Sequence, residues 1–177
     1  MPADLKSLVR SIQDYPKKGI LFRDITTLIE DPVGFRESCE QLAAAHEGLG
    51  ITHVAGIEAR GFIFGAGVAI ELGVGFVPIR KRGKLPGKTL GENYVLEYGV
   101  DTIEIHADVL DDSHKVLLID DLIATGGTAL AAVSLLRRTG ATCRNAGFAI
   151  DLFDLGGAEK LRALDVEVFK LIDFEGH

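Results

Sequence analysis

Runs of apolar residues of strand length alternate along the chain with segments whose apolar positions repeat at helical spacing. Three runs are almost continuously apolar, which is typical of strands buried on both faces of a sheet, and they lie at 52–57, 75–80 and 115–120. Helical spacing follows two of these runs, at 60–73 and at about 127–139. Because glycine readily ends helices, Gly73 and Gly140 mark the expected ends of these two helices.

The N-terminal part carries two further helical signals. Asp31 and Pro32 supply a cap and a first-turn proline for a helix of about residues 33–46. Ahead of them, helical spacing of apolar residues predicts a helical segment that includes Leu5, Leu8, Val9 and Ile12.

The second half of the chain adds a hairpin and more buried strands. Residues 94–98 and 102–106 alternate apolar and polar positions around Gly99 and Asp101, which predicts a half-exposed hairpin. Two apolar runs then flank a short helical pattern, at 144–151, 157–164 and 166–173. Buried strands that alternate with helices predict an α/β fold with a mostly parallel, right-handed central sheet flanked by helices. No repeat or linker interrupts the pattern, so we expect a single domain over 1–177.

Composition and charge limit the location and the partners. The 177 residues are 47% hydrophobic and 25% charged, with a net charge of −7, which argues against general affinity for nucleic acid or an anionic membrane. No stretch approaches a membrane span and the start lacks a signal-peptide core, so a cytoplasmic location is expected. Cys39 and Cys143 stand far apart and are expected to be packed thiols. The five histidines show no metal-ligand spacing, so no zinc site is expected.

The segment VLLIDDLIATGGTA, at 116–129, carries the clearest chemical signal. Ligands of an α/β sheet bind outside the carboxyl ends of its strands, and this segment leaves a buried strand for a helix. Gly126 and Gly127 permit backbone angles that let successive amides point at one anion, and the helix N-terminus adds a positive field. Thr125 and Thr128 add hydroxyl donors. We interpret the loop as a phosphate cradle.

Asp120 and Asp121 precede this cradle and need a ligand that rewards two ionised carboxylates near a phosphate. Two sugar hydroxyls, or a hydrated magnesium ion, would do so. The alternative is a capped strand-to-helix turn with solvated aspartates.

The same segment closely resembles the phosphoribosyl diphosphate signature of the type I phosphoribosyltransferases. The resemblance implies that fold, and that Asp120 and Asp121 hold the ribose hydroxyls. It also implies that the 5-phosphate is held by the loop residues Ala124, Thr125, Gly126, Gly127 and Thr128.

The stretch RKRGKLPGKT, at 80–89, concentrates cations in an otherwise acidic chain. Such a run is usually a solvated face, but beside a phosphate-binding sheet edge it can serve as a mobile anion clamp that neutralises a diphosphate leaving group. Together with YVLEYG it is very similar to the flexible catalytic loop and return strand of the adenine phosphoribosyltransferases. The resemblance implies that Arg80, Lys81 and Lys84 face the diphosphate, with Arg80 and Lys81 in catalytic roles.

GIEARGF, at 56–62, joins a strand to a helix and offers a third anion site. Ala59 and Arg60 can aim an amide and a guanidinium at a phosphate, although Arg60 as a surface ion-pair partner is the alternative. The family resemblance implies that this is the diphosphate loop, often with a cis peptide at the position between Glu58 and Ala59.

Three further roles rest on the resemblance. Glu97 of LEYG is implied to be the acid/base residue near the purine, although a strand glutamate would otherwise simply face water. YPKKGILFRDIT, at 15–26, is similar to the purine-covering hood, which would span about 1–30 before a core of about 31–177. The implied adenine-binding residues are Leu21, Phe22 and Arg23, with Leu152 as a weaker candidate; a core position is the alternative for Phe22.

The resemblance spans nearly the whole chain and implies a reaction. Adenine and phosphoribosyl diphosphate would give AMP and diphosphate, with Mg²⁺ held mainly by the substrate and with no direct protein ligand. Relatives are usually homodimers. Two alternatives remain: a phosphoribosyltransferase for 6-oxopurines or orotate, and a phosphoribosyl diphosphate sensor that regulates transcription or RNA. The hood and LEYG favour adenine, and the chain has no broad basic face of the kind a sensor would need.

Two other nucleotide-binding motifs are excluded by spacing. GKT at 87–89 looks like the end of a Walker A loop, but Arg82 stands where that motif needs glycine. GFIFGAG lacks the GxGxxG spacing of a dinucleotide loop, and no GxSxG occurs.

Overall fold

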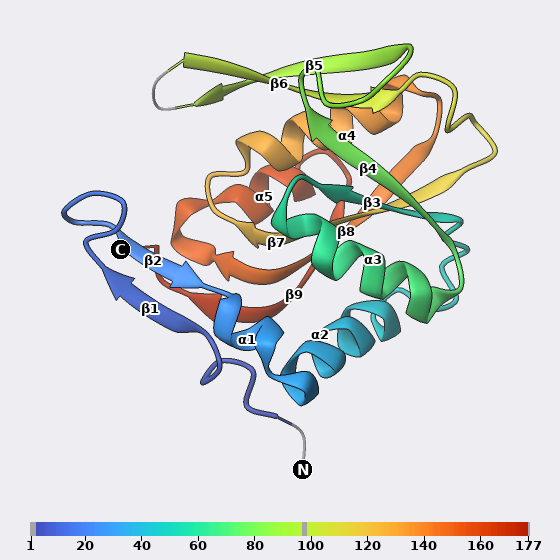
Figure 1. Ribbon diagram of the computed structural model, residues 1–177. Coiled ribbons are helices and arrows are strands. Elements are labelled where there is room, and N and C mark those ends of the chain that lie inside the picture. Colours follow the sequence, from blue (N-terminus) through green and yellow to red (C-terminus); the bar gives the residue numbers. More distant parts are fainter. Residues whose placement is uncertain (1–2, 97–98, 177) are drawn as a thin grey trace.

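The computed structural model describes residues 3–96 and 99–176. A seven-stranded sheet lies between helices on both faces, and a two-stranded sheet stands beside it (Figure 1). In chain order the elements are β1 (Arg10–Gln13), β2 (Leu21–Asp24), α1 (Thr26–Glu30), α2 (Pro32–Ala44), β3 (His53–Ile57), α3 (Arg60–Leu72), β4 (Gly75–Lys81), β5 (Thr89–Leu96), β6 (Gly99–His106), β7 (Lys115–Ile123), α4 (Gly127–Arg138), β8 (Thr142–Leu152), the 3₁₀ helix η1 (Phe153–Leu155), α5 (Gly157–Arg162) and β9 (Glu167–Phe174).

The large sheet has the strand order β5-β6-β4-β3-β7-β8-β9. Strands β4, β3, β7, β8 and β9 run parallel, while β5 and β6 form an antiparallel hairpin that joins the sheet through β4. The expectation of a mostly parallel α/β sheet is therefore confirmed. From β3 the chain moves to β4 on one side, and from β7 it moves to β8 on the other. The strand order thus reverses between β3 and β7, where a ligand crevice is expected in such sheets.

Two apolar cores cover the two faces of the sheet. Leu117 and Ile119 of β7 pack with the residues of α2 and α3, whereas Val116 and Leu118 pack on the opposite face with α4. All four side chains are at most 1% exposed. The almost unbroken apolar run of β7 therefore follows from burial on both faces, as the sequence predicted.

All three helices predicted with a cap or an end residue, at 33–46, 60–73 and 127–139, are present as α2, α3 and α4. The carboxylate of Asp31 accepts hydrogen bonds from the amides of Val33 and Gly34, at 3.1 and 2.7 Å, and so caps α2. Helix α3 ends at Gly73, whose φ of 66° lies in the left-handed region that glycine adopts without strain. Over residues 3–96 and 99–176, no helix is both long and apolar enough to span a membrane.

The predicted helical segment at the N-terminus is wrong: the described residues before α1 form turns and strands. Leu8 and Val9 donate backbone hydrogen bonds to residues three positions earlier, which gives turns rather than a helix. Residues 10–13 then form β1, in which Ile12 lies opposite Phe22 of β2. Leu5 and Val9 are both 7% exposed. Their shared burial accounts for the helical spacing, but cross-strand pairing decides the local structure.

Strand β7 is also longer than predicted. Its pairing with β8 continues past the two aspartates to Ile123, which lies opposite Asp151. Asp121, which lies beyond the predicted strand of 115–120, therefore belongs to β7 together with Asp120. Since the side chains of successive strand residues point to opposite faces, the side chains of Asp120 and Asp121 leave the backbone on opposite faces of the sheet.

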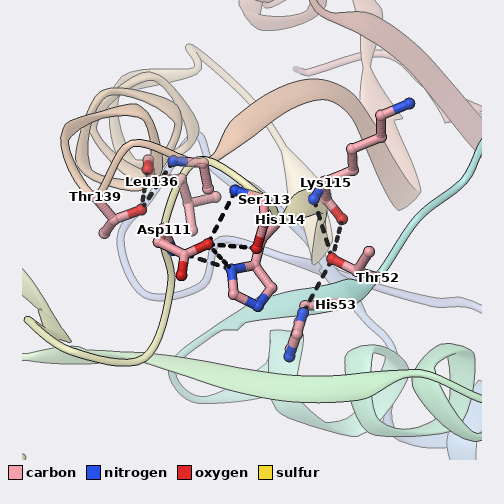
Figure 2. Close-up of polar contacts among 9 residues, drawn as sticks. Thr52, His53, Asp111, Ser113, His114, Lys115, Leu136 and Thr139 are labelled. Carbon is pink, nitrogen blue, oxygen red and sulfur yellow. Dashed lines mark hydrogen bonds and ion pairs between the residues drawn. The ribbon is translucent and has the colours of Figure 1, made fainter.

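Polar contacts join the chain at the amino ends of β3 and β7, at the sheet edge opposite Asp120 and Asp121 (Figure 2). The hydroxyl of Thr52 accepts from the amide of Lys115 at 3.0 Å and donates to its carbonyl at 3.1 Å. The rings of His53 and His114 lie edge to face at 4.7 Å, and Nδ1 of His114 lies 2.8 Å from the carboxylate of Asp111. These contacts help to fix the register of the two strands that carry the site.

The Asp31 cap gives a stability prediction. Asp31→Ala removes the only side-chain acceptor of the α2 N-terminus described here and should lower the free energy of unfolding by about 1 kcal/mol. Urea unfolding followed by circular dichroism measures the change. Asp31→Asn keeps a side-chain acceptor and should remain close to the parent chain. Equal losses in both variants would mean that the carboxylate charge, and not the cap, supplies the stability.

Candidate functional site

A cleft of about 840 Å³ opens at the carboxyl ends of the parallel strands. It lies at the crossover of the strand order, between the loop after β3 and the loop after β7. Its lining comes from 57–60, 94–96 and 120–129, together with Lys81 and Leu155. The sheet topology therefore brings three segments that are distant in sequence to one cleft.

The loop after β7 forms one wall of the cleft. All five residues expected to hold a phosphate line it, from Ala124 to Thr128. Gly126 has a φ of 87° and stands immediately before α4, with no side chain capping that helix. The first amides of α4 are therefore left without a side-chain partner at the end of the helix that favours anions. This geometry suits a phosphate group.

The two aspartates occupy different environments beside this loop. Asp121 is 4% exposed, and its carboxylate lies 2.6 Å from Nε of Arg60. Asp120 accepts a hydrogen bond from the amide of Asp121 at 2.9 Å. Burial of the carboxyl group and repulsion from Asp121 raise the pKa of Asp120 well above its ordinary value. The folded chain therefore accommodates the negative charge of Asp120 less well than water would.

The loop after β3 approaches these aspartates closely. A Cβ atom at Gly61 would lie 2.7 Å from Oδ1 of Asp120 and 3.1 Å from the backbone oxygen of Ile119, so a side chain there would displace the Asp120 carboxylate or the start of α3. The peptide between Glu58 and Ala59 is cis, at the position that the resemblance indicated. Arg60 forms an ion pair, as the alternative interpretation expected, but its partner lies in the cleft.

Glu58 organises the cationic segment and was missed by the sequence analysis. Its carboxylate accepts from the guanidinium of Arg80 at 3.0 Å and from the amide of Lys81 at 2.8 Å. Burial raises the pKa of Glu58, but these hydrogen bonds and the Arg80 charge outweigh it and lower the pKa. The signal for this role was available in GIEARGF, where an acid directly precedes the loop.

Lys81 is the cation of 80–89 that lines the cleft. Its ammonium group lies 3.5 Å from the carboxylate of Asp101, which also accepts from the hydroxyl of Tyr94 at 3.1 Å. Burial and the neighbouring Asp101 raise the pKa of Tyr94 to about 12. Arg80 does not line the cleft, and its guanidinium donates to the carbonyl of Lys84 at 3.3 Å.

None of the described residues expected to bind adenine lines the cleft. Phe22 is half-buried, outside both apolar cores, and the guanidinium of Arg60 lies 5.9 Å from its ring. Arg23 lies over the ring of Phe174 at 4.2 Å, whereas Leu152 is 9% exposed within a core. Leu21 pairs with Gln13 of β1. Glu97 lies outside the described residues.

The fold and this cleft define an α/β protein that binds a phosphorylated, hydroxyl-bearing ligand at the carboxyl edge of its sheet. Comparison with known proteins gives the family. Residues 34–177 match the phosphoribosyl transferase domain. An adenine phosphoribosyltransferase from Bradyrhizobium sp. is 60% identical over 174 residues, which cover 98% of this chain and 97% of the relative.

Two solved structures are similar over almost the full length. An adenine phosphoribosyltransferase from Thermoanaerobacter pseudethanolicus has a TM-score of 0.91 and 46% identity, covering 97% of this chain and 98% of the other. The Saccharomyces cerevisiae enzyme, complexed with D-2,5-dideoxy-2,5-imino-altritol 1,6-bisphosphate and adenine, has a TM-score of 0.89 and 37% identity, covering 96% and 97%. The chain belongs to the adenine phosphoribosyltransferases of the type I phosphoribosyltransferase family.

The electrostatics of the aspartate pair give a prediction for stability against pH. A carboxyl group with a raised pKa binds its proton more tightly in the folded chain, so its contribution to stability falls as pH rises through that pKa. Asp120→Asn should therefore raise Tm at pH 7 by about 2–4 °C, and the gain should shrink towards pH 4. Calorimetry across this range measures it, with the exposed Asp108→Asn as the control. A gain that stays constant with pH would contradict this cause.

Proposed function

We infer that this chain is an enzyme of purine salvage that transfers the 5-phosphoribosyl group of phosphoribosyl diphosphate to N9 of adenine. The products are AMP and diphosphate. The main structural support is the glycine loop and the aspartate pair, which lie together where the strand order reverses. The sequence support is 60% identity to a named adenine phosphoribosyltransferase. The S. cerevisiae relative was solved with adenine and a sugar bisphosphate analogue, which fits this pair of substrates.

We propose that the loop from Ala124 to Thr128 holds the 5-phosphate and that Asp120 and Asp121 hold the ribose hydroxyls. An ionised carboxylate accepts two hydroxyl donors well. Asp121 is held by Arg60, so its orientation is fixed before the ligand arrives. Asp120 has a raised pKa, and hydrogen bonds from a ribose diol would favour its ionised form. Ligand binding would thus relieve a local electrostatic cost.

The diphosphate leaving group would be neutralised from the opposite wall. Arg60 and Lys81 line the cleft, while Arg80 and Lys84 lie outside its lining and contact each other. Cations placed where negative charge develops lower the barrier as the bond to the anomeric carbon breaks. We propose that Arg80 and Lys81 are catalytic in this sense and that Ala59, Arg60 and Lys84 bind the diphosphate.

The purine would be read by the hood. We propose that Phe22 stacks on adenine, that Leu21 and Arg23 present backbone groups to its edge, and that Leu152 approaches the other face. The ring of Phe22 lies near Arg60, which supports a base site beside the diphosphate loop. Glu97 would accept or share the N9 proton as N9 attacks the anomeric carbon.

Magnesium fits the donor set of the cleft. The carboxylate oxygens of Asp120 and Asp121 are the kind of donor that Mg²⁺ accepts, largely through its bound waters. We propose that the ion is held mainly by the substrate. When bound, it supplies positive charge that neutralises the phosphate and diphosphate oxygens.

The remaining proposals concern assembly and location. We propose a single domain with a hood of about 1–30, and a homodimer. The proposal of a dimer rests on the family resemblance, since relatives are usually homodimers. We propose a cytoplasmic location, since Cys39 and Cys143 are free and buried. Burial raises their pKa to about 11 and about 12.

A product assay tests the reaction directly. The protein is mixed with Mg²⁺ and phosphoribosyl diphosphate and offered adenine, hypoxanthine, guanine, xanthine and orotate in parallel. We expect AMP from adenine alone, resolved by chromatography. Turnover of another base would keep the phosphate cradle and overturn the adenine assignment, whereas tight binding without product would favour a sensor.

The role of Glu97 has its own test. Glu97→Ala should lower kcat by about tenfold or more because it removes the proton acceptor, while calorimetric affinity for phosphoribosyl diphosphate stays unchanged. Glu97→Gln separates proton transfer from polarisation of the base: it should resemble the alanine variant if the proton moves to Glu97. Near-normal turnover in both variants would assign the acid/base role elsewhere.

A further inference from the structure

The loop that begins at Ala124, proposed above to hold the 5-phosphate, contacts α5 on its side away from the cleft. The sequence analysis gave α5 no function. The amide of Gly157 donates to the carbonyl of Ala124 at 3.0 Å. The ammonium group of Lys160, one turn further along α5, donates to the carbonyl of Thr125 at 2.8 Å. Two successive carbonyls of the loop are therefore held from the same short helix, which packs beside α4 (Figure 1).

These two contacts determine where the loop amides point. In a planar trans peptide the C=O and N–H groups point in opposite directions. With the carbonyls of Ala124 and Thr125 directed at α5, the amides of Thr125 and Gly126 are turned to the other side of the loop. Those amides are the donors that a phosphate in the cleft would need.

Close packing of two glycines makes this arrangement possible. A Cβ atom at Gly157 would lie 2.8 Å from the backbone nitrogen of Gly126, and one at Gly126 would lie 2.9 Å from Cα of Gly157. Both obstacles are backbone atoms, which cannot rotate away as a side chain can. Any side chain at position 157 would therefore push the loop from α5.

Helix α5 acts on the site only through the loop. Among the described residues that line the cleft, none belongs to α5. Lys160 is exposed and contacts a backbone carbonyl there, not the space a ligand would occupy. Its neighbours on the helix, Glu159 and Arg162, pair with each other at 2.7 Å. Arg162 is thus a matched control: a cation on the same helix with no described contact to the loop.

We propose that Lys160 and Gly157 are positioning residues for the 5-phosphate: they hold the loop carbonyls on the α5 side so that its amides face the phosphate. This inference rests on the proposed role of the loop in phosphoribosyl transfer. It assigns part of the affinity for any 5-phosphorylated ligand to residues outside the cleft.

The test compares Lys160→Met, Lys160→Arg and Arg162→Met in the full-length chain. Calorimetry gives the Kd of AMP, of ribose 5-phosphate and of inorganic diphosphate, and steady-state kinetics gives KM for each substrate. Loss of one charge-assisted hydrogen bond should weaken AMP and ribose 5-phosphate about three- to tenfold in Lys160→Met and raise KM for phosphoribosyl diphosphate similarly. Diphosphate affinity and KM for adenine should stay within about twofold, since neither ligand carries the 5-phosphate.

The other two variants separate this role from a general effect on charge or folding. Lys160→Arg keeps a donor and should recover most of the affinity, and Arg162→Met should match the parent chain. Equal weakening of all ligands, or equal effects of Lys160→Met and Arg162→Met, would overturn the inference. If the parent chain makes no AMP and binds no AMP or ribose 5-phosphate, the proposed function itself fails.

Gly157→Ala gives a second measurement. The added Cβ should displace the loop and weaken AMP binding more than Lys160→Met does, with diphosphate affinity retained. Thermal unfolding with and without AMP shows whether the variant folds and whether AMP still stabilises it. A folded Gly157→Ala chain with normal AMP affinity would also overturn the inference.

Discussion

The parallel pairing of β3 with β7 is the constraint on which the site depends. It joins Gly56 to Ile119 in register, so the residues just beyond these positions must emerge at one edge. The loop after β3 begins there, and at the same edge β7 ends, with Asp120 and Asp121 among its last residues before the loop of residues 124–126. Because the strand order reverses at this pair, the helices α3 and α4 go to opposite faces and leave space between their N-termini. A cleft flanked by two helix N-termini is suited to a ligand with phosphate groups at both ends.

Opposite charges are organised around that space before any ligand binds. Arg60 is paired with Asp121, and Glu58 holds Arg80 and the backbone of Lys81. These contacts reduce the reorganisation needed when a charged substrate enters, which is the main electrostatic contribution of a preorganised site. Asp120 is the exception, since its raised pKa reflects a charge that the folded chain accommodates poorly. Groups kept at a cost to stability are typical of functional sites.

Elements outside the cleft hold its walls in place. The hairpin of β5 and β6 is fastened along α4, where Arg138 donates to the carbonyl of Gly91 at 2.5 Å and to the carboxylate of Glu92 at 2.9 Å. Helix α5 holds the opposite side of the phosphate loop through Gly157 and Lys160. Helix α4 therefore follows the glycine loop at its N-terminus and contacts the β5–β6 hairpin through Arg138 near its C-terminus.

The sequence by itself determined the α/β class, most element positions and the glycine loop that precedes α4. These follow from local rules: burial on both faces gives continuous apolar strands, Asp31 caps its helix, and a glycine pair before a helix frees amides for an anion. Local patterns failed at residues 10–13, where pairing with β2 overrides helical spacing, and at the end of β7, where pairing with β8 extends the strand to Ile123. Only the tertiary structure decided that Arg60 pairs with Asp121, that Glu58 holds Arg80, and that Lys160 reaches Thr125. These contacts join residues 22 to 61 positions apart, and no local pattern of side chains specifies which distant partner the folded sheet will bring within 3 Å.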